Sequence, residues 1–309
     1  MFTNRNYTFD NDFPQEFSHL RNKKIDDWEI APWDIVIDTE QLLGKGEFGY
    51  VYLAKWKSTQ VVAKVIKGNI TNDQKELFLN EFNILSKSHH PNIVQIFGYV
   101  ENPFIIVMEY LSDQDLLYHI RKNRLSLVNK INICLDILKG VEYLHTHKPQ
   151  SIIHRDLKPQ NIILNTSKTA KISDFGLSRF LDNNHSSKKF PEENLSELTK
   201  TSNEDGLTTM VGTKRYMSPE VTQQPRYNQK IDIWSLGVIF SELFENRRYN
   251  SDFYWRKTPV RIQKIIQEYM LKENPDNRLN AQEIIVFFEN IKSRYTKKKY
   301  YPFSCLFKK

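Results

Sequence analysis

The order of two residue patterns limits the folds open to this 309-residue chain. Residues 35–66 are rich in β-branched and aromatic side chains interrupted by glycines, which predicts a run of antiparallel strands. Residues 72–87 carry apolar side chains at the spacing of one helix face, and strand-like runs follow at residues 93–99 and 104–110. The first third of the chain is therefore predicted to form a small antiparallel sheet with one helix.

Helical patterns dominate the remainder of the chain. Four segments carry apolar residues at helical spacing: residues 125–147, 230–245, 261–271 and 281–293. A sheet followed by helices, without alternation along the chain, favours an α+β fold in two lobes over a parallel α/β sheet. Residues 182–206 are almost wholly polar, and we expect them to form a flexible insertion.

The formal net charge of +7 is concentrated at the C-terminal end. Residues 292–309 hold seven basic residues and no acidic one, so the 37 basic residues before them match the chain's 37 acidic residues. A neutral body argues against a polyanion-binding protein, and we expect no nucleic-acid partner. The basic, aromatic tail at residues 295–309 leaves three hypotheses open: contact with an anionic membrane surface, contact with RNA, or a frayed end.

Cysteine content and the N-terminal sequence bear on the compartment. Cys134 and Cys305 are the only cysteines and are far apart in sequence, so they suggest neither a metal cluster nor a disulfide framework. The first residues lack the basic-then-apolar order of a signal peptide, and no apolar run is long enough to span a bilayer. We expect an intracellular protein, cytoplasmic in the simplest case.

A glycine-rich stretch lies within the expected strands. Gly44, Gly46 and Gly49 allow a sharp hairpin turn and a close approach of backbone N–H groups to phosphate oxygens. The pattern alone fits a plain hairpin equally well. A strand follows it instead of a helix, which argues against a dinucleotide-binding fold.

Lys64 lies in an apolar strand-like run, and Glu81 lies in the helix that follows. An ammonium group within such a strand needs a counter-charge, which a carboxylate and a nucleotide phosphate would supply. The alternative is a lysine at a strand end whose side chain extends to water.

The strongest motif is the run from His154 to Asn161, followed by Asp-Phe-Gly at residues 174–176. Phosphoryl transfer needs a carboxylate that orients a hydroxyl, Asn and Asp oxygens for Mg²⁺, and a lysine near the migrating group. All of these residue types occur in the two motifs, with Asp156 and Lys158 inside the first. On these residues the chain resembles the eukaryotic protein kinase family over about residues 35–294.

Further landmarks agree with this resemblance. Residues 212–220 are similar to the end of an activation segment, and residues 232–237 to the buried anchor helix. The family pairs an arginine with a glutamate, here Arg278 with Glu220. The sequence of residues 174–179 is most similar to that of the tyrosine-kinase-like branch. Lys158 and Thr213 are residues typical of serine/threonine kinases at these positions.

The resemblance implies a set of ATP-binding residues. The glycine-rich loop would cover the phosphates, a lysine would hold the α- and β-phosphates, and a gating residue, a hinge and apolar neighbours would enclose adenine. These residues are Gly44, Gly46, Gly49, Val51, Val62, Lys64, Met108, Glu109, Leu111 and Ile163.

It also implies a set of catalytic residues. Asp156 would be the catalytic base, and Lys158 would steady the γ-phosphate. Glu81 would orient Lys64. Mg²⁺ would be held by the oxygens of Asn161 and Asp174.

Departures from the family pattern bear on regulation and substrate docking. Val62 replaces a common alanine beside adenine, and the stretch 244–278 is short, so the helix that often docks substrates is expected to be truncated or missing. Thr209 lies where the family often carries an activating phosphate, which Arg155 and Arg179 would pair with. An unmodified loop threonine is the alternative.

We therefore predict a bilobal α+β protein kinase that transfers the γ-phosphoryl group of ATP to Ser or Thr of protein substrates, with Mg²⁺. Residues 1–34 would form an N-terminal extension, 35–294 the kinase domain divided between residues 109 and 110, and 295–309 the tail. The alternatives are a catalytically silent scaffold with the same fold and a tyrosine or dual-specificity kinase.

Overall fold

The computed structural model describes residues 27–45, 49–66, 72–181, 187–188, 214–223, 226–250 and 252–297. The predictions for Gly46, Thr209, most of the polar insertion and the tail from residue 298 lie outside these ranges. The chain forms two compact units, one from residues 1–76 with 95–110 and the other from residues 77–94 with 111–309.

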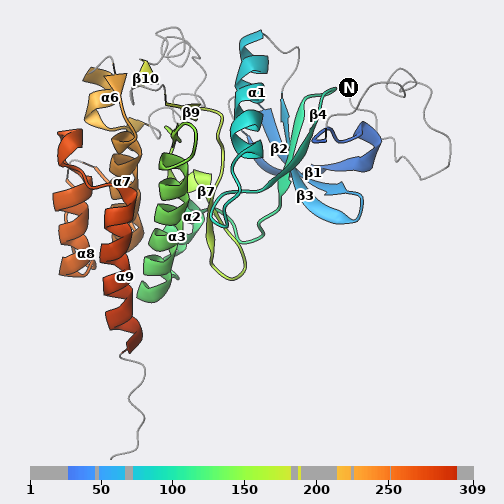
Figure 1. Ribbon diagram of the computed structural model, residues 1–309. Coiled ribbons are helices and arrows are strands. Elements are labelled where there is room, and N and C mark those ends of the chain that lie inside the picture. The colour runs from blue at the N-terminus through green and yellow to red at the C-terminus, as the bar shows by residue number, and fades with distance from the viewer. Residues whose placement is uncertain are drawn as a thin grey trace, which may run out of the picture. The chain divides into compact units, whose positions relative to one another are not determined.

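The first unit contains a five-stranded antiparallel sheet in the order β1-β2-β3-β5-β4. Figure 1 labels four of these strands, β1 to β4. The central strand β3 alternates buried and part-exposed side chains, so that Val61 and Ala63 enter a core that also contains Val107 and Val100. This pattern confirms the antiparallel sheet predicted from the sequence. The strands are β1 (Ile35–Lys45), β2 (Gly49–Trp56), β3 (Thr59–Ile66), β4 (Ile96–Val100) and β5 (Ile105–Glu109).

A segment before the sheet docks along β4. The backbone N–H of Ile30 donates to Tyr99 O at 2.7 Å, and Tyr99 N donates to Trp28 O at 2.9 Å. Ile30 is buried in the core of the sheet. A Cβ atom at Gly98 would lie 2.4 Å from Trp28 O, so this close approach requires glycine. A short 3-10 helix at Pro32–Asp34 then leads into β1.

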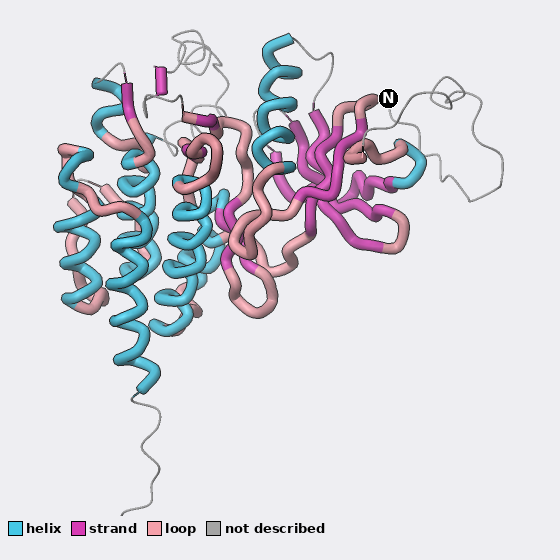
Figure 2. The backbone as a smooth tube through the Cα atoms, in the orientation of Figure 1, coloured by secondary structure: helices cyan, strands magenta, loops and turns pink. Residues whose placement is uncertain are grey.

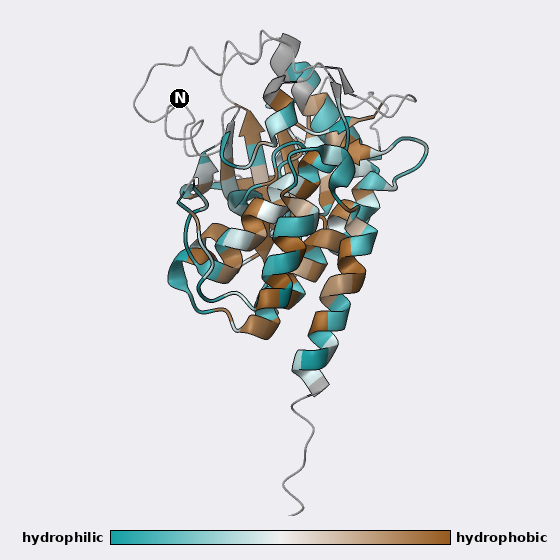
Figure 3. Ribbon diagram, turned by 90° about the vertical axis from the view of Figure 1, so that its left-hand side faces the viewer, coloured by the Kyte–Doolittle hydropathy of each residue, from teal (hydrophilic) through white to brown (hydrophobic). Residues whose placement is uncertain are grey.

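The second unit consists mainly of helices, which Figure 2 shows in cyan. Local signals set their ends: Ser126 Oγ caps α3 by accepting from Asn129 N at 3.1 Å, and α7 ends at Asn246 in the left-handed conformation. α3 packs against both α7 and α9. The helices carry apolar and polar residues together in Figure 3, and α7 is buried along nearly its whole length. They are α2 (Leu116–Lys122), α3 (Leu127–His145), α6 (Pro219–Gln223), α7 (Lys230–Glu245), α8 (Val260–Ile265) and α9 (Ala281–Lys297).

Short antiparallel pairs fix the loops of this unit. β6 (Ile152–Ile153) pairs with β9 (Arg179–Phe180), and β7 (Ile162–Leu164) pairs with β8 (Ala170–Ile172). The motif run 154–161 therefore leaves β6 and enters β7 through a 3-10 turn at Pro159–Asn161. A third pair joins β10 (Ser187–Lys188) to β11 (Arg226–Tyr227).

The structure differs from the predicted elements in one region. α1 (Asn72–Ser86), which spans both units, and α7 agree closely with the sequence pattern. The helix expected at residues 261–271 is instead α8 followed by a π-helix, Ile266–Met270, in which Leu271 N donates to Ile266 O. This last turn packs on Gly237 of α7, where a Cβ would lie 2.8 Å from Leu271 Cδ2.

Among the described residues between Glu245 and Val260 no helix occurs, and α8 is the short helix that follows. None of the helices in the described part is both long and apolar enough to cross a bilayer.

Candidate active site

Asp232, at the start of α7, fixes the backbone of the loop that leaves β6. Its Oδ2 accepts from His154 N at 2.9 Å and lies 2.9 Å from His145 Nε2, while its Oδ1 accepts from Arg155 N at 3.0 Å. The carboxylate is fully buried, and hydrogen bonds and the electrostatic influence of His145 lower its pKa despite the opposing effect of burial. Both oxygens are used, so Asp232 serves as an anchor.

Asp156 lies just beyond this anchor and is 7% exposed. Its Oδ2 accepts from Lys158 Nζ at 2.6 Å and from Asn161 Nδ2 at 3.0 Å. Asn161 Nδ2 also donates to the Asp156 carbonyl at 2.8 Å. The structure thus brings together three residues that the sequence predicted to act in one site.

The second oxygen of Asp156 differs from the first. Asp156 Oδ1 is buried and accepts no hydrogen bond from any residue that the structure describes. A buried carboxylate oxygen without a donor is costly, about 1–3 kcal/mol or more for a charged group. The arrangement favours a ligand that brings an O–H or N–H donor to this atom.

His154 is locked in its neutral form within the same loop. Its Nδ1 accepts from Asp156 N at 3.3 Å, which leaves Nε2 to donate to Ser173 O at 3.1 Å. Complete burial lowers its pKa, against the opposing influence of nearby carboxylates including Asp232. His154 therefore links the backbone of Asp156 to the strand end at Ser173.

Asn161 and Asp174 supply oxygen atoms of the kind that Mg²⁺ prefers. Because the amide nitrogen of Asn161 is committed to Asp156, its Oδ1 is the atom available to a cation. Asp174 is exposed and has a left-handed φ of 63°, a conformation that costs a non-glycine residue energy and is frequent at functional sites. Over the described ranges no group of three or more His, Cys, Asp or Glu side chains could hold a metal. Two protein oxygens fit Mg²⁺, which keeps waters and binds substrate phosphates.

The sheet unit carries most of the predicted phosphate- and adenine-binding residues. Lys64 lies mid-strand in β3, opposite Val51 of β2 and Ile106 of β5. Gly49 opens β2, and a Cβ there would lie 2.1 Å from Val65 O, so the backbones of β2 and β3 approach as only glycine permits. Gly44 lies in β1 near its end.

The remaining predicted adenine contacts are divided between the units. In the sheet unit Val62 pairs with Met108, and Glu109 Oε1 accepts from Gln95 N at 2.7 Å. Leu111 and Ile163 belong to the helical unit, where Ile163 pairs with Lys171 in β7 and β8. Glu81 is buried in the part of α1 that belongs to the helical unit.

The predicted pair between Arg278 and Glu220 is confirmed. Arg278 Nη1 and Nη2 donate to the two carboxylate oxygens of Glu220 at 2.6 and 2.8 Å, and both side chains are buried. The guanidinium carbon also lies 5.1 Å from the centre of the Trp234 ring. This pair joins the helix after the activation segment to the loop before α9.

One functional feature was not predicted from the sequence. The anchoring role of Asp232 and its partner His145 was missed, because 87 residues separate the two along the chain. An aspartate near the start of an otherwise apolar helix was the available signal, since a buried charge requires partners. Arg155, predicted to pair with a phosphate at Thr209, is buried with its guanidinium carbon 5.5 Å from the Tyr227 ring centre, and burial lowers its pKa to about 10.

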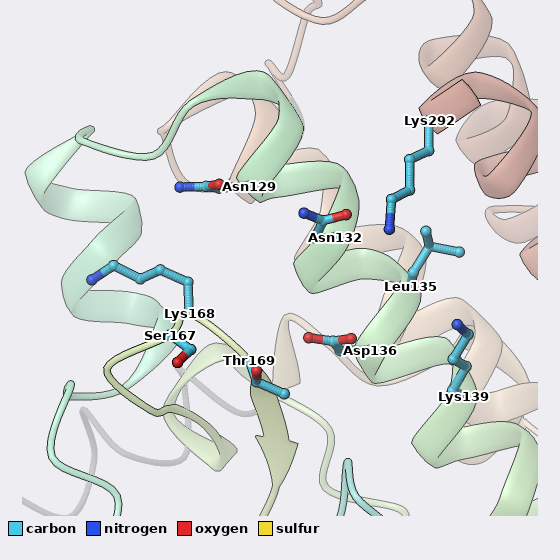
Figure 4. A pocket seen from close by; sticks show the side chains of 9 residues that line it. All are labelled: Asn129, Asn132, Leu135, Asp136, Lys139, Ser167, Lys168, Thr169 and Lys292. Atoms are coloured by element: carbon cyan, nitrogen blue, oxygen red, sulfur yellow. The ribbon is translucent and has the colours of Figure 1, made fainter. Parts of the chain in front are cut away.

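A polar pocket of about 200 Å³ lies between α3, the turn from β7 to β8, and α9 (Figure 4). Three of its charged side chains already have partners: Lys168 pairs with Asp113, Lys139 pairs with Glu289, and Asp136 Oδ2 accepts from Ala170 N at 3.0 Å. None of the predicted site residues lines it.

Comparison with known proteins gives a consistent result. The family model described as "Protein kinase domain" matches residues 37–287. Serine/threonine-protein kinase VIK of Arabidopsis thaliana is 34% identical over 75% of this chain and 53% of the relative. Serine/threonine-protein kinase shk2 of Schizosaccharomyces pombe is 34% identical over 81% of this chain and 38% of the relative.

A tyrosine-protein kinase, Btk of Drosophila melanogaster, is 29% identical over 81% of this chain and 29% of its own length. The chain therefore spans about half or less of the length of these curated relatives.

Proposed function

Because the chain belongs to the protein kinase family, we propose that it transfers the γ-phosphoryl group of ATP to serine or threonine hydroxyls of protein substrates. The observation that carries this proposal is the buried Oδ1 of Asp156, a carboxylate oxygen that accepts no hydrogen bond from the residues that the structure describes. A substrate hydroxyl is such a donor, and the bond would orient its oxygen toward the phosphoryl group.

The roles of the other residues follow from their contacts. Lys158, 2.6 Å from Asp156 Oδ2, would exchange this partner in part for the γ-phosphate and so balance the charge that develops there. Asn161 would hold Asp156 through Nδ2 and use its Oδ1 for Mg²⁺. Bound Mg²⁺ would neutralise charge on the phosphates, and Asp174 would supply a second protein oxygen for it.

Most of the remaining residues proposed to bind ATP belong to the sheet unit. We assign Lys64 to the α- and β-phosphates, with Glu81 as its orienting partner, and the loop of Gly44, Gly46 and Gly49 to the phosphate cover. Adenine would contact the remaining predicted residues, Val51, Val62, Met108, Glu109, Leu111 and Ile163. Phosphorylation of Thr209 is our proposal for the regulation of this site.

The test is autophosphorylation of the purified chain with labelled ATP and Mg²⁺, followed by phosphoamino-acid analysis. We expect labelled Ser or Thr in the wild type, and a loss of label of at least about a hundredfold in Asp174→Ala. Asp276→Ala removes an exposed carboxylate elsewhere in the same unit and should retain full labelling.

Two outcomes would revise the proposal. Labelled tyrosine would favour the tyrosine or dual-specificity alternative, which the similarity to Btk motivates. Nucleotide binding by the wild type without incorporation into itself or into a mixed protein substrate would favour the scaffold alternative.

A further inference from the structure

The segment between α7 and α8 is fixed in place although it contains no helix among its described residues. Glu245, at the end of α7, accepts from the backbone N–H groups of Arg256, Lys257 and Thr258 at 3.0, 2.9 and 2.9 Å. Thr258 Oγ1 donates to the same carboxylate at 2.6 Å. These bonds lower the pKa of Glu245, so the carboxylate stays charged and holds the segment near neutral pH.

This segment presents arginines stacked on aromatic rings. The guanidinium carbon of Arg247 lies 4.0 Å from the centre of the Tyr254 ring and 4.6 Å from that of Phe253. The guanidinium carbon of Arg256 lies 4.4 Å from the same Tyr254 ring. Phe253 in turn contacts Trp255, with ring centres 5.1 Å apart. We call Arg247, Phe253, Tyr254, Trp255 and Arg256 the arginine–aromatic surface.

Two like charges are held close together on this surface. Since both guanidinium carbons lie near one ring centre, they are within about 8 Å of each other, and their repulsion opposes this arrangement. Within the part of the chain that the structure describes, neither arginine has a carboxylate at salt-bridge distance. An anionic ligand would relieve that repulsion.

The surrounding charge has the same sign. Residues 246–258 contain four basic residues and one acidic residue, Asp252, within a body of the chain that is formally neutral over residues 1–291. Tyr254 is 45% exposed and Arg256 is exposed, so these two groups are open to a partner, whereas Arg247 is half-buried. Arg247 Nη2 donates to Tyr254 O, and this bond holds the side chain in one orientation. Its Nε is buried and has no acceptor among the described residues.

Stacking on a ring covers the faces of a guanidinium group and leaves its N–H edge for hydrogen bonds in the plane. At Arg256, whose guanidinium group makes no hydrogen bond to any described residue, a carboxylate matches that edge with two parallel bonds. Arg247 has Nη2 committed to Tyr254 O and Nε buried, so Nη1 is its group left for an acid. An ordered arginine loses less entropy when it forms such bonds. The exposed ring of Tyr254 and the partly exposed rings of Phe253 and Trp255 suit an apolar side chain next to the acid.

We propose that the arginine–aromatic surface binds an acidic segment of a partner protein, in which Asp or Glu residues alternate with apolar ones. The segment lies in extended form across Tyr254, with its carboxylates on Arg247 and Arg256 and its apolar side chains on Phe253 and Trp255. Binding needs neither ATP nor the residues assigned to phosphoryl transfer.

The test is fluorescence anisotropy on the full chain with two labelled peptides. One alternates glutamate with leucine and phenylalanine, and the other carries glutamine in place of every glutamate. We expect saturable binding of the glutamate peptide alone, weakened by added salt. Arg256→Gln should weaken it by about tenfold, and Arg256→Lys by an intermediate factor, because lysine keeps the charge but loses the planar edge.

Lys122→Gln is the matched control, because Lys122 lies 5.6 Å from the ring centre of Tyr118 in an exposed cation–π pair on α2 of the same unit. It removes the same charge and should leave affinity unchanged. Equal binding of the two peptides, or equal losses in Arg256→Gln and Lys122→Gln, would overturn the proposal. Displacement of the peptide by single-stranded RNA at far lower concentration would show that the partner class is wrong. A labelled-nucleotide binding assay on the same variants keeps this result separate from the proposed kinase activity.

Discussion

Asp232 and Asp156 are two buried carboxylates of the same unit with opposite hydrogen-bonding states. Both oxygens of Asp232 accept hydrogen bonds from backbone N–H groups, Oδ2 from His154 and Oδ1 from Arg155. Oδ2 also lies next to Nε2 of His145. Asp156 uses one oxygen for two donors and leaves the other without one in the described structure. The comparison teaches that a saturated carboxylate holds a loop, whereas a half-saturated one beside it is ready for a ligand.

Asp156→Asn should have the largest effect, on activity alone. The amide cannot accept the hydroxyl proton, so labelled phosphate transfer should fall by about a hundredfold to ten-thousandfold. The free energy of unfolding from urea titration should fall by less than in Asp232→Ala, because the amide keeps an oxygen for Lys158 and Asn161 and Oδ1 has no donor among the described residues to lose. Asp136→Asn, which alters another partly buried carboxylate on α3, is the control and should retain activity. Retention of wild-type transfer rates in Asp156→Asn would remove Asp156 from the mechanism.

Asp232→Ala should instead act on stability. It leaves the N–H groups of His154 and Arg155 buried without an acceptor, so the free energy of unfolding should fall by about 3–5 kcal/mol. Urea titration followed by tryptophan fluorescence would measure it. Ser241→Ala on the same helix loses only a bond to Gly237 O and should cost about 1 kcal/mol. If Asp232→Ala were as stable as the wild type but inactive, Asp232 would have a direct role in activity, and its assignment as a structural anchor would be wrong.

Acidification should lower the stability of the folded chain, first through His154 and at lower pH through Asp232. Its folded pKa is lowered by burial, so the unfolded chain takes up the proton first and stability should fall as the pH drops below about 6.5. The pKa of Asp232 is also lowered, so its contribution persists until the pH falls below about 3.8. Thermal unfolding measured between these pH values would follow this loss, and His154→Gln should reduce the slope of stability against pH. The residual slope combines His90, whose pKa burial also lowers, with Asp115, Asp136 and Glu242, whose pKa burial raises and which therefore contribute with the opposite sign.

Ser218→Ala should give the smallest effect, with the opposite sign. Ser218 Oγ is buried and has no partner among the described residues, so an apolar side chain there should raise the free energy of unfolding by about 1 kcal/mol. A small rise in melting temperature with unchanged activity is expected. Loss of activity would mean that this hydroxyl, unlike that of a merely buried serine, serves the substrate.

The sequence predicted the parts of this molecule whose signals are local. The sheet, the helices at residues 72–86 and 230–245, and the close grouping of Asp156, Lys158 and Asn161 all follow from short-range patterns. The anchor at Asp232 did not, because its partners come from distant parts of the chain. The π-helix after Ile265 was also missed, since it packs against a glycine of another helix and its own apolar period is ordinary.

The arginine–aromatic surface could not be predicted from the sequence either. Its residues are close in sequence, yet the pattern gave no reason to expect stacked guanidinium groups, because their geometry depends on the carboxylate of Glu245. Among the described residues, Asp156 Oδ1 has no hydrogen-bond donor, and the two arginines of this surface have no carboxylate partner. The test of each uses a different ligand, so the two proposals stand or fall separately.

Gly98 should couple the evolution of β4 to that of residues 28–30, which contact it. Any side chain at this position would displace Trp28 O and with it the strand-like segment that covers β4 and buries Ile30. Homologues that keep an equivalent of residues 28–30 on the sheet should therefore keep glycine at this position, whereas those that have lost the segment are free to vary there. The pairing is a covariation signature by which descendants of this arrangement can be recognised from sequence.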